Sequence, residues 1–173
     1  MKKFILMAAI GLLMSLGVNA QKQGYINVSE LLSSLPAFEK AKQDLASFSK
    51  PFEEAYATME KEYETKVNAF KKDQKTMSDA VKEMRISEIQ DLEARIMKYR
   101  QDTEEKLANK ERDLLTPIYQ SIEKAINDYA KANGFDYVFT QEALLYAKDS
   151  ENLTNALITK MGGKKPAPKP AGK

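Results

Sequence analysis

The feature that most constrains this chain is a long segment, residues 37–132, that contains no glycine and only two prolines. Apolar residues return every three or four positions along it, which is the spacing of amphipathic helices. In the first half this stripe consists of Phe38, Ala41, Leu45, Phe48, Phe52, Ala55, Met59, Tyr63, Val67, Phe70 and Met77. In the second half it consists of Ile89, Leu92, Ile96, Tyr99, Thr103, Leu107, Leu114, Ile118, Ile122, Ala125 and Tyr129. The stripe is one residue wide, so each helix can bury only a seam against a single neighbour.

The segment is too long to be one straight helix in a domain of this size. A continuous helix would extend about 140 Å at ~1.5 Å per residue. The stripe weakens at residues 76–79, where Thr76, Ser78 and Asp79 can cap a new helix. The sequence therefore predicts an antiparallel helical hairpin over residues 37–117, a coiled-coil arm on the order of 50–60 Å long.

Two prolines, Pro51 and Pro117, interrupt this arm. Glu53 and Glu54 follow Pro51, and Thr116 precedes Pro117, as at the first turn of a helix. We expect the helix to restart and kink at each proline. The prolines then act either as hinges that let the arm swing or, the interpretation that we favour, as static bends around a packing partner.

Both ends of the chain predict short strands. Residues 25–28 alternate in polarity, and Ser29 is placed to cap a helical turn that Pro36 ends. After the long helix, Gly134 predicts a stop, and residues 137–140 and 144–147 predict two more strands.

Three strands of about four residues bury too little apolar surface to be stable alone, and their open edges favour pairing with other chains. Residues 153–161 predict a last amphipathic helix. The predicted fold class is therefore α+β, predominantly α. A small β-rich body, residues 21–36 and 118–161, self-associates and carries the arm.

The two ends of the chain differ in composition from the segments between them. Lys2 and Lys3, the apolar run 4–18 and the small-residue end at Ala20 predict a secretory signal, residues 1–20, cleaved after Ala20. At the other end, residues 162–173 are rich in Lys and Pro and are predicted to be disordered. Their four separated lysines form a weak patch for transient contact with anionic envelope surfaces, so we favour a solubilising role.

Composition excludes several classes of function. The chain has no Cys, His or Trp, so it lacks the side chains of a catalytic triad, a His-based zinc site or a thiol nucleophile. Carboxylates such as Glu60, Glu62 and Glu104 lie on exposed helix faces, without the pocket that acid–base catalysis needs. Removing Lys2 and Lys3 leaves 25 basic against 25 acidic side chains, which argues against nucleic-acid binding. We predict no catalytic residue, no metal and no cofactor.

Methionine and aromatic side chains on the arm are the more informative ones. Flexible, polarizable methionine suits a surface that accepts many apolar segments. The candidates for such binding are Met59, Tyr63, Phe70, Met77, Met84, Met97 and Tyr99. For Tyr63, Phe70 and Tyr99 we favour the alternative that they form the hairpin seam. For Met77 and Met84, near the predicted tip, the two interpretations are equally weighted.

The order of elements resembles one family. A Gly24-Tyr25-Ile26-Asn27-Val28 strand, a charged helical hairpin, Ile122-x-x-Ala125-Ile126 and then Asn133-Gly134-Phe135-Asp136-Tyr137-Val138 are similar, over residues 24–161, to the Skp (OmpH) family of periplasmic chaperones. The resemblance implies a homotrimer joined through the β-rich body, with three arms around a cavity. In that cavity the family holds unfolded outer-membrane β-barrel proteins, without ATP, before membrane insertion.

The resemblance also implies which residues assemble the trimer. By position they are Tyr25, Ile26, Val28, Tyr137, Val138, Phe139, Leu144, Leu145 and Tyr146. Family members are often basic whereas this chain is neutral without its signal, so no lipopolysaccharide site is carried over. The alternative is a structural or adaptor coiled-coil protein of the cell envelope that binds a folded partner. A lipid carrier would need an apolar concavity that this charge density does not supply.

Overall fold

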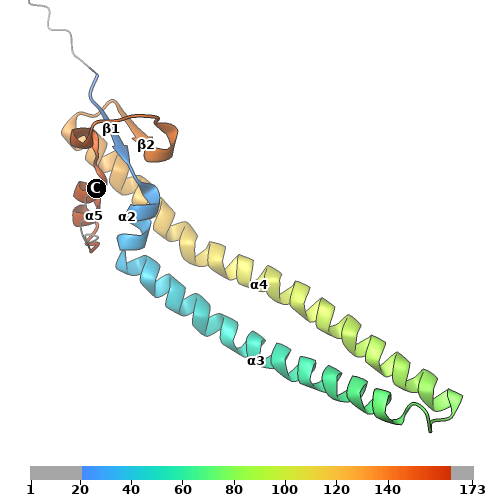
Figure 1. Cartoon of the computed structure of the whole chain (residues 1–173). Coiled ribbons are helices and arrows are strands. Elements are labelled where there is room, and N and C mark those ends of the chain that lie inside the picture. The colour runs from blue at the N-terminus through green and yellow to red at the C-terminus, as the bar shows by residue number, and fades with distance from the viewer. Residues whose placement is uncertain (1–20, 165–173) are drawn as a thin grey trace, which may run out of the picture.

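The computed structural model describes residues 21–164, which form a small body and one long projecting hairpin (Figure 1). The predicted signal, residues 1–20, and residues 165–173 of the predicted tail lie outside this range. The first residues of that tail are held in place, because the backbone N–H of Gly163 donates to the Ile158 carbonyl (2.8 Å) and that of Lys164 to the Ser34 carbonyl (2.9 Å).

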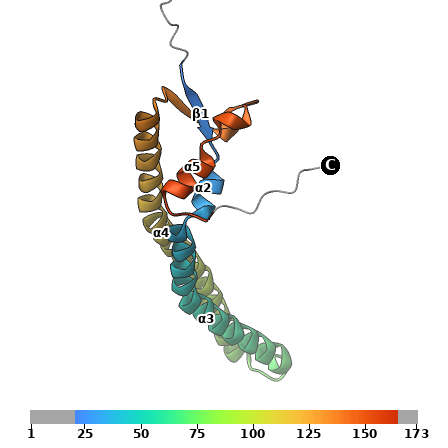
Figure 2. The ribbon, with the colours of Figure 1, turned by 90° about the vertical axis from the view of Figure 1, so that its left-hand side faces the viewer.

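The hairpin consists of α3 (Pro36–Asp73) and α4 (Asp79–Asn133), which run side by side. The turn between them, residues 74–78, overlaps the predicted reversal. Every residue of both predicted stripes is buried or partly buried, and Leu92 is 1 % exposed. Seen from the side, the pair of helices curves along its length (Figure 2). The helical periodicity of the sequence is thus sufficient to define the seam.

Both prolines lie inside continuous helices, Pro51 in α3 and Pro117 in α4. The predicted helix restarts are therefore wrong. Each proline lacks one backbone donor, but the turns on either side keep their own hydrogen bonds and their seam contacts, so the helix continues. Next to Pro117, the Thr116 hydroxyl donates to the Arg112 carbonyl (2.7 Å).

The sheet of the body joins the two ends of the chain. Strand β1 (Gln23–Ile26) pairs in parallel with β2 (Tyr137–Thr140), with Gln23 opposite Tyr137 and Ile26 opposite Thr140. On the other side of β1, Tyr25 forms a bridge with Asn152, and the Leu153 N–H donates to the Tyr25 carbonyl (2.8 Å). Strand β1 is therefore covered on both sides, and β2 is the edge strand of the subunit.

The predicted third strand, residues 144–147, is wrong. A short 3-10 helix, η1 (Gln141–Ala143), follows β2, and residues 144–148 are irregular up to a second one, η2 (Asp149–Glu151). Leu144 and Ala147 are partly buried, whereas Leu145 and Tyr146 are exposed. A short segment is stable as a strand only when its backbone is hydrogen-bonded to a neighbouring strand. Within the described residues of one subunit, residues 144–147 have no such neighbour.

The core lies where the body meets the arm. Helices α2 (Val28–Ser34) and α5 (Thr154–Lys160) pack on the start of α3 and the end of α4. The buried cluster comprises Ile26, Leu31, Leu35, Ala41, Ile118, Ile122, Leu153, Leu157 and Ile158. The Asn27 side chain caps α2 by accepting a hydrogen bond from the Glu30 N–H (2.8 Å), so α2 starts before the predicted Ser29 cap. Gly134 ends α4, with a φ of +66°.

Candidate functional site

The structure divides the arm candidates into two groups. Met59, Tyr63, Phe70, Met77 and Tyr99 are partly buried along the seam between α3 and α4. Met84 and Met97 point away from it, with 50 % and 61 % of their surface exposed. Only the second group offers most of its side chain to another molecule without a change in the hairpin.

Three further exposed apolar residues escaped the sequence analysis: Val81, Ile86 and Tyr119. They are apolar residues at helix positions outside the apolar stripe. This departure from the stripe could have identified them in the sequence. Val81 and Ile86 flank Met84 in the first turns of α4, so exposed apolar side chains gather next to the turn of the hairpin.

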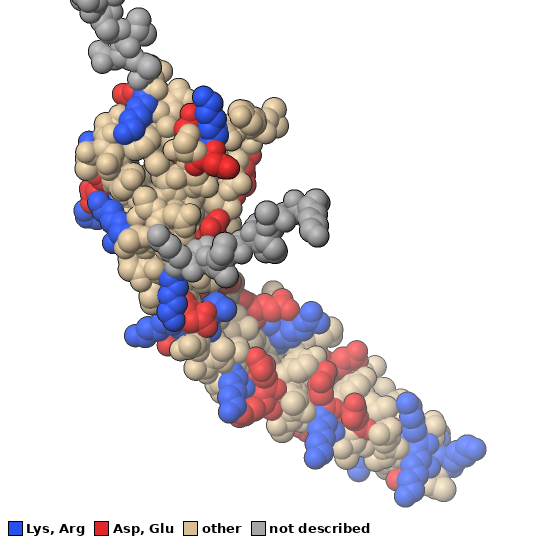
Figure 3. Space-filling model, turned by 60° about the vertical axis from the view of Figure 1, so that its left-hand side comes forward, with Lys and Arg blue, Asp and Glu red and all other residues tan. Residues whose placement is uncertain are grey.

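The far end of the arm is also cationic. Lys71 and Lys72 lie in the last turn of α3 and Lys75 in the connecting turn, and Figure 3 shows Lys and Arg side chains gathered at that end. Elsewhere on the visible face of the arm, basic and acidic side chains alternate (Figure 3). The arm therefore ends in a surface that combines exposed apolar and positively charged groups.

One ion pair ties the two helices of the arm together near this end. Lys66 Nζ of α3 lies 3.1 Å from Glu88 Oε2 of α4, and Arg85 also contacts that oxygen, at 3.2 Å. The hydrogen bond from Lys66 lowers the pKa of the Glu88 carboxyl group. Among the ion pairs of residues 21–164, every other one joins residues within a single helix.

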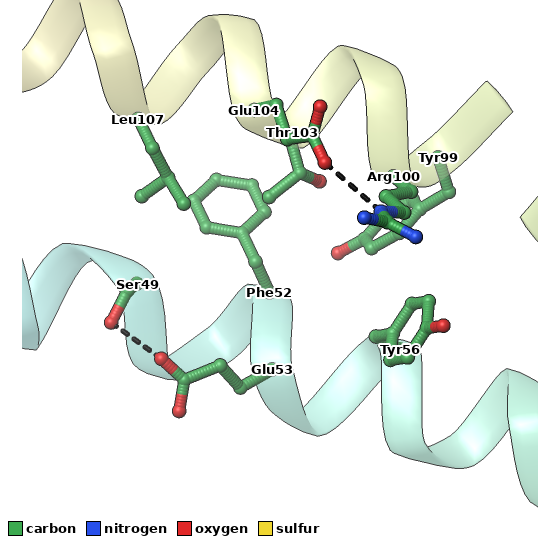
Figure 4. A pocket seen from close by; sticks show the side chains of 9 residues that line it. All are labelled: Ser49, Phe52, Glu53, Tyr56, Tyr99, Arg100, Thr103, Glu104 and Leu107. Carbon is green, nitrogen blue, oxygen red and sulfur yellow. Dashed lines mark hydrogen bonds and ion pairs between the residues drawn. The ribbon is translucent and has the colours of Figure 1, made fainter. Parts of the chain in front are cut away.

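A cavity of about 310 Å³ lies between the helices in the middle of the arm (Figure 4). It is lined by Ser49, Phe52, Glu53, Tyr56, Tyr99, Arg100, Thr103, Glu104 and Leu107. Its charged groups have partners on their own helix: Glu53 accepts from Ser49 (2.7 Å), and Arg100 donates to Glu104 (2.9 Å). The wall between them is largely apolar and aromatic.

The predicted assembly residues also fall into distinct groups. Tyr25 and Ile26 are buried in the core of their own subunit, and Val28, Val138 and Leu144 are partly buried.

The exposed members of the assembly set are Tyr137, Phe139, Leu145 and Tyr146. Tyr137 and Phe139 alternate with Val138 on β2, so both rings lie on one face of the edge strand, stacked with centroids 6.2 Å apart. An aromatic face on an unpaired edge strand is the kind of surface that another chain can cover.

Within residues 21–164 there is no cluster of three or more Asp and Glu side chains placed to hold a metal ion. No helix in that range combines the length and the apolar character needed to cross a membrane. The candidate hinges, Pro51 and Pro117, lie inside α3 and α4 respectively.

Comparison with known proteins gives a consistent result. A family model described as outer membrane protein (OmpH-like) matches residues 22–161. The chain is 28 % identical over 166 residues to the chaperone protein Skp of Vibrio cholerae, which covers 91 % of this chain and 98 % of that protein. It is 29 % identical over 165 residues to the chaperone protein Skp of Yersinia enterocolitica, and the match covers 89 % of this chain and 95 % of that protein.

A solved structure shares the fold. The crystal structure of a candidate OmpH-like outer membrane chaperone from Caulobacter crescentus CB15 matches with a TM-score of 0.68, over 84 % of this chain and 86 % of the other. At 13 % sequence identity, this similarity concerns the arrangement of the helices and strands.

Proposed function

Because the chain belongs to the OmpH-like family of outer membrane proteins, we propose that it is a periplasmic holdase chaperone for unfolded outer-membrane β-barrel proteins. It encloses them between helical arms and prevents their aggregation, without ATP, before they insert into the membrane. The family consists of chaperones and not of enzymes, and the relatives named above are chaperones.

The observation that carries this proposal is the long, thin arm. Two helices that share a one-residue seam leave most of their surface free, and that surface combines charges with scattered apolar side chains such as Met84 and Met97. Each apolar contact with a client contributes only fractions of a kcal/mol, but many act together on a mobile chain. A client that folds into a membrane buries the same surface there, so release needs no fuel.

The body is proposed to assemble three subunits. Tyr137, Phe139, Leu145 and Tyr146 supply exposed apolar surface for this contact, and the outer edge of β2 supplies free backbone groups. The buried side chains of Tyr25 and Ile26 would contribute to assembly indirectly, by holding β1 in register with β2. Their part in assembly is a prediction. In this division of labour, residues 37–117 hold the client and residues 21–36 and 118–161 join the subunits.

Light scattering tests the proposal directly. A urea-unfolded outer-membrane β-barrel protein is diluted into purified residues 21–173, and the molar mass of the soluble species is measured. We expect a complex of three chains and one client. If the client aggregates while the chain remains a clean oligomer, the chaperone proposal fails, and a structural or adaptor role in the envelope takes its place.

A further inference from the structure

The last residues of the described chain pack against the place where the arm leaves the body. We propose that residues 161–164, called the latch below, hold the arm at a fixed angle, at a hinge made of Leu35 and Pro36 on one helix and Pro117 on the other. Residues 162–164 lie beyond the range that the family model matches. The inference concerns the single subunit and goes beyond the proposed function; in a chaperone, the arm angle sets the space that the arms enclose.

The first half of the hinge is a one-residue joint between two helices. Leu35 alone separates α2 from α3, and its backbone is extended, with φ −84° and ψ 132°. Pro36 begins α3, and its nitrogen carries no hydrogen that could continue the helical hydrogen bonds of α2 across the joint. Rotation about the backbone of a single residue therefore changes the direction of α3 relative to α2.

The second half of the hinge lies on α4. Pro117 lacks the N–H group that would donate to the carbonyl four residues earlier. The Thr116 hydroxyl donates to the Arg112 carbonyl (2.7 Å), a contact that often bends helices. Ile118, directly after this proline, belongs to the buried core, as does Leu35 directly before the proline of α3. On both helices, a proline therefore adjoins a core residue.

A hollow of about 460 Å³ places the two halves of the hinge next to each other. Its walls are formed by Leu35, Pro36, Ala37, Pro117, Ile118, Ser121 and Met161. Pro36, Ala37, Pro117 and Ser121 are exposed, so on this side the arm has few packed contacts to lose when it bends. The Met161 side chain packs against the core and lines the hollow, so it stands in the path of such a bend.

A helix-capping motif holds the latch in place. Gly162 follows α5 with a φ of +71°, and its N–H donates to the Thr159 carbonyl (3.2 Å). The N–H of Gly163 donates to the Ile158 carbonyl (2.8 Å). These two hydrogen bonds form a Schellman motif, in which a glycine adopts the left-handed conformation at low cost. The motif turns the chain from the end of α5 back toward α2.

This turn brings the backbone of Lys164 to the last residue of α2. The Lys164 N–H donates to the Ser34 carbonyl (2.9 Å), which belongs to the last turn of α2 and has no donor within that helix. Gly163 lies so close that a Cβ atom there would be 2.9 Å from the same oxygen. Figure 2 shows the segment after α5 passing the junction of α2 and α3. The latch thus ties α5 to the residue that precedes the hinge.

Distances between spin labels measure the arm angle. The chain has no cysteine, so Ser47→Cys on the arm and Lys131→Cys at the body end of α4, both at exposed positions, allow specific labelling. Labelled chains are mixed with an excess of unlabelled chains, so that distances within one subunit dominate. We expect Lys164→Pro, which removes the N–H donor, to broaden the distance distribution. Lys164→Ala keeps the donor, is the matched control, and should match the wild type.

Gly163→Ala tests the latch without a proline. We expect it to broaden the distribution as well, because its Cβ atom and the Ser34 carbonyl oxygen cannot both keep their places. Circular dichroism and thermal unfolding show that each variant is folded at the temperature of the measurement. If either Lys164→Pro or Gly163→Ala keeps the wild-type distribution, the latch is wrong.

A double variant locates the hinge. In the Lys164→Pro protein, Pro117→Ala restores a helical hydrogen bond at the hinge and should narrow the distribution again. Pro51→Ala is the matched control and should leave the width unchanged, because the label at position 47 lies on the body side of Pro51. A distribution that stays broad with Pro117→Ala would overturn the hinge. All distances are measured without a client, so the result is independent of the light-scattering test of the chaperone function.

Discussion

At the scale of single residues, burial separates two kinds of leucine in the body. Leu157 is 0 % exposed within the core, whereas Leu145 is fully exposed beyond β2. We predict that Leu157→Ala lowers the free energy of unfolding by about 2–5 kcal/mol, because it leaves a cavity that the core cannot close. Urea unfolding followed by circular dichroism measures this, and a loss below about 1 kcal/mol would contradict the assigned core.

Leu145 and Tyr146 lead to the opposite prediction. Replacing both with Ser should leave the fold of the subunit intact, since neither side chain packs within it, but should shift the assembly toward smaller species. Sedimentation velocity at several protein concentrations checks this. An unchanged oligomer would exclude these two residues from the subunit contact and leave Tyr137 and Phe139 as the exposed candidates.

At the scale of elements, the Lys66–Glu88 pair makes the arm sensitive to acid. The pKa of Glu88 is lower in the folded protein, so the pair stabilises the hairpin above the ordinary glutamate pKa of about 4.3 and loses this contribution as the pH falls through the lowered value. We expect Glu88→Gln to reduce hydrogen-exchange protection near the turn at pH 7, and this difference from the wild type to shrink as the pH falls toward 3.

Comparing the two proteins at each pH cancels the intrinsic pH dependence of exchange. Glu62→Gln, an exposed substitution on α3, is the control and should match the wild type throughout. A difference for Glu88→Gln that persists undiminished at pH 3 would mean that packing, rather than the ion pair, links the helices there.

The two prolines give a further prediction for the helices. Pro51→Ala restores a backbone N–H in a helix that is already continuous, so it should stabilise the arm, by about 1–3 kcal/mol. Distances between spin labels on the arm tip and the body then separate the two interpretations: a hinge gives a narrower distribution in the variant, and a static bend leaves its width unchanged. A less stable variant would show that Pro51 is required by the local packing.

Sequence periodicity predicted the elements of the arm well and its surface poorly. All residues of both stripes are buried or partly buried, because a period near 3.6 directly sets which side of a helix is buried. The strand expected at residues 144–147 did not form, because strand formation depends on a partner that local sequence does not specify. The mid-arm cavity depends on the distance between the two helices, and the lack of a hydrogen-bond partner for the Thr103 hydroxyl depends on one side-chain rotamer. Residue spacing in the sequence specifies neither.

At the scale of the whole molecule, arm and body should be separable. Deleting residues 66–99 shortens the hairpin but leaves the core cluster, which lies in the body and at the base of the arm, untouched. We predict that the shortened protein keeps the oligomeric state of the full chain and no longer prevents aggregation of an unfolded barrel. Light-scattering mass and turbidity measure the two properties. Dissociation of the shortened protein would show that the arms contribute to assembly.

The parallel pairing of β1 with β2 also has a consequence in time. Lys22 and Asp136, which are hydrogen-bonded across the start of these strands, are 114 residues apart in the chain. A protein is synthesised from its N-terminus, so β1 is made long before β2, while the local contacts of the hairpin can form as soon as α3 and α4 exist. The core of the body is complete only after Ile158 has been synthesised, so the body closes after the hairpin can already have formed.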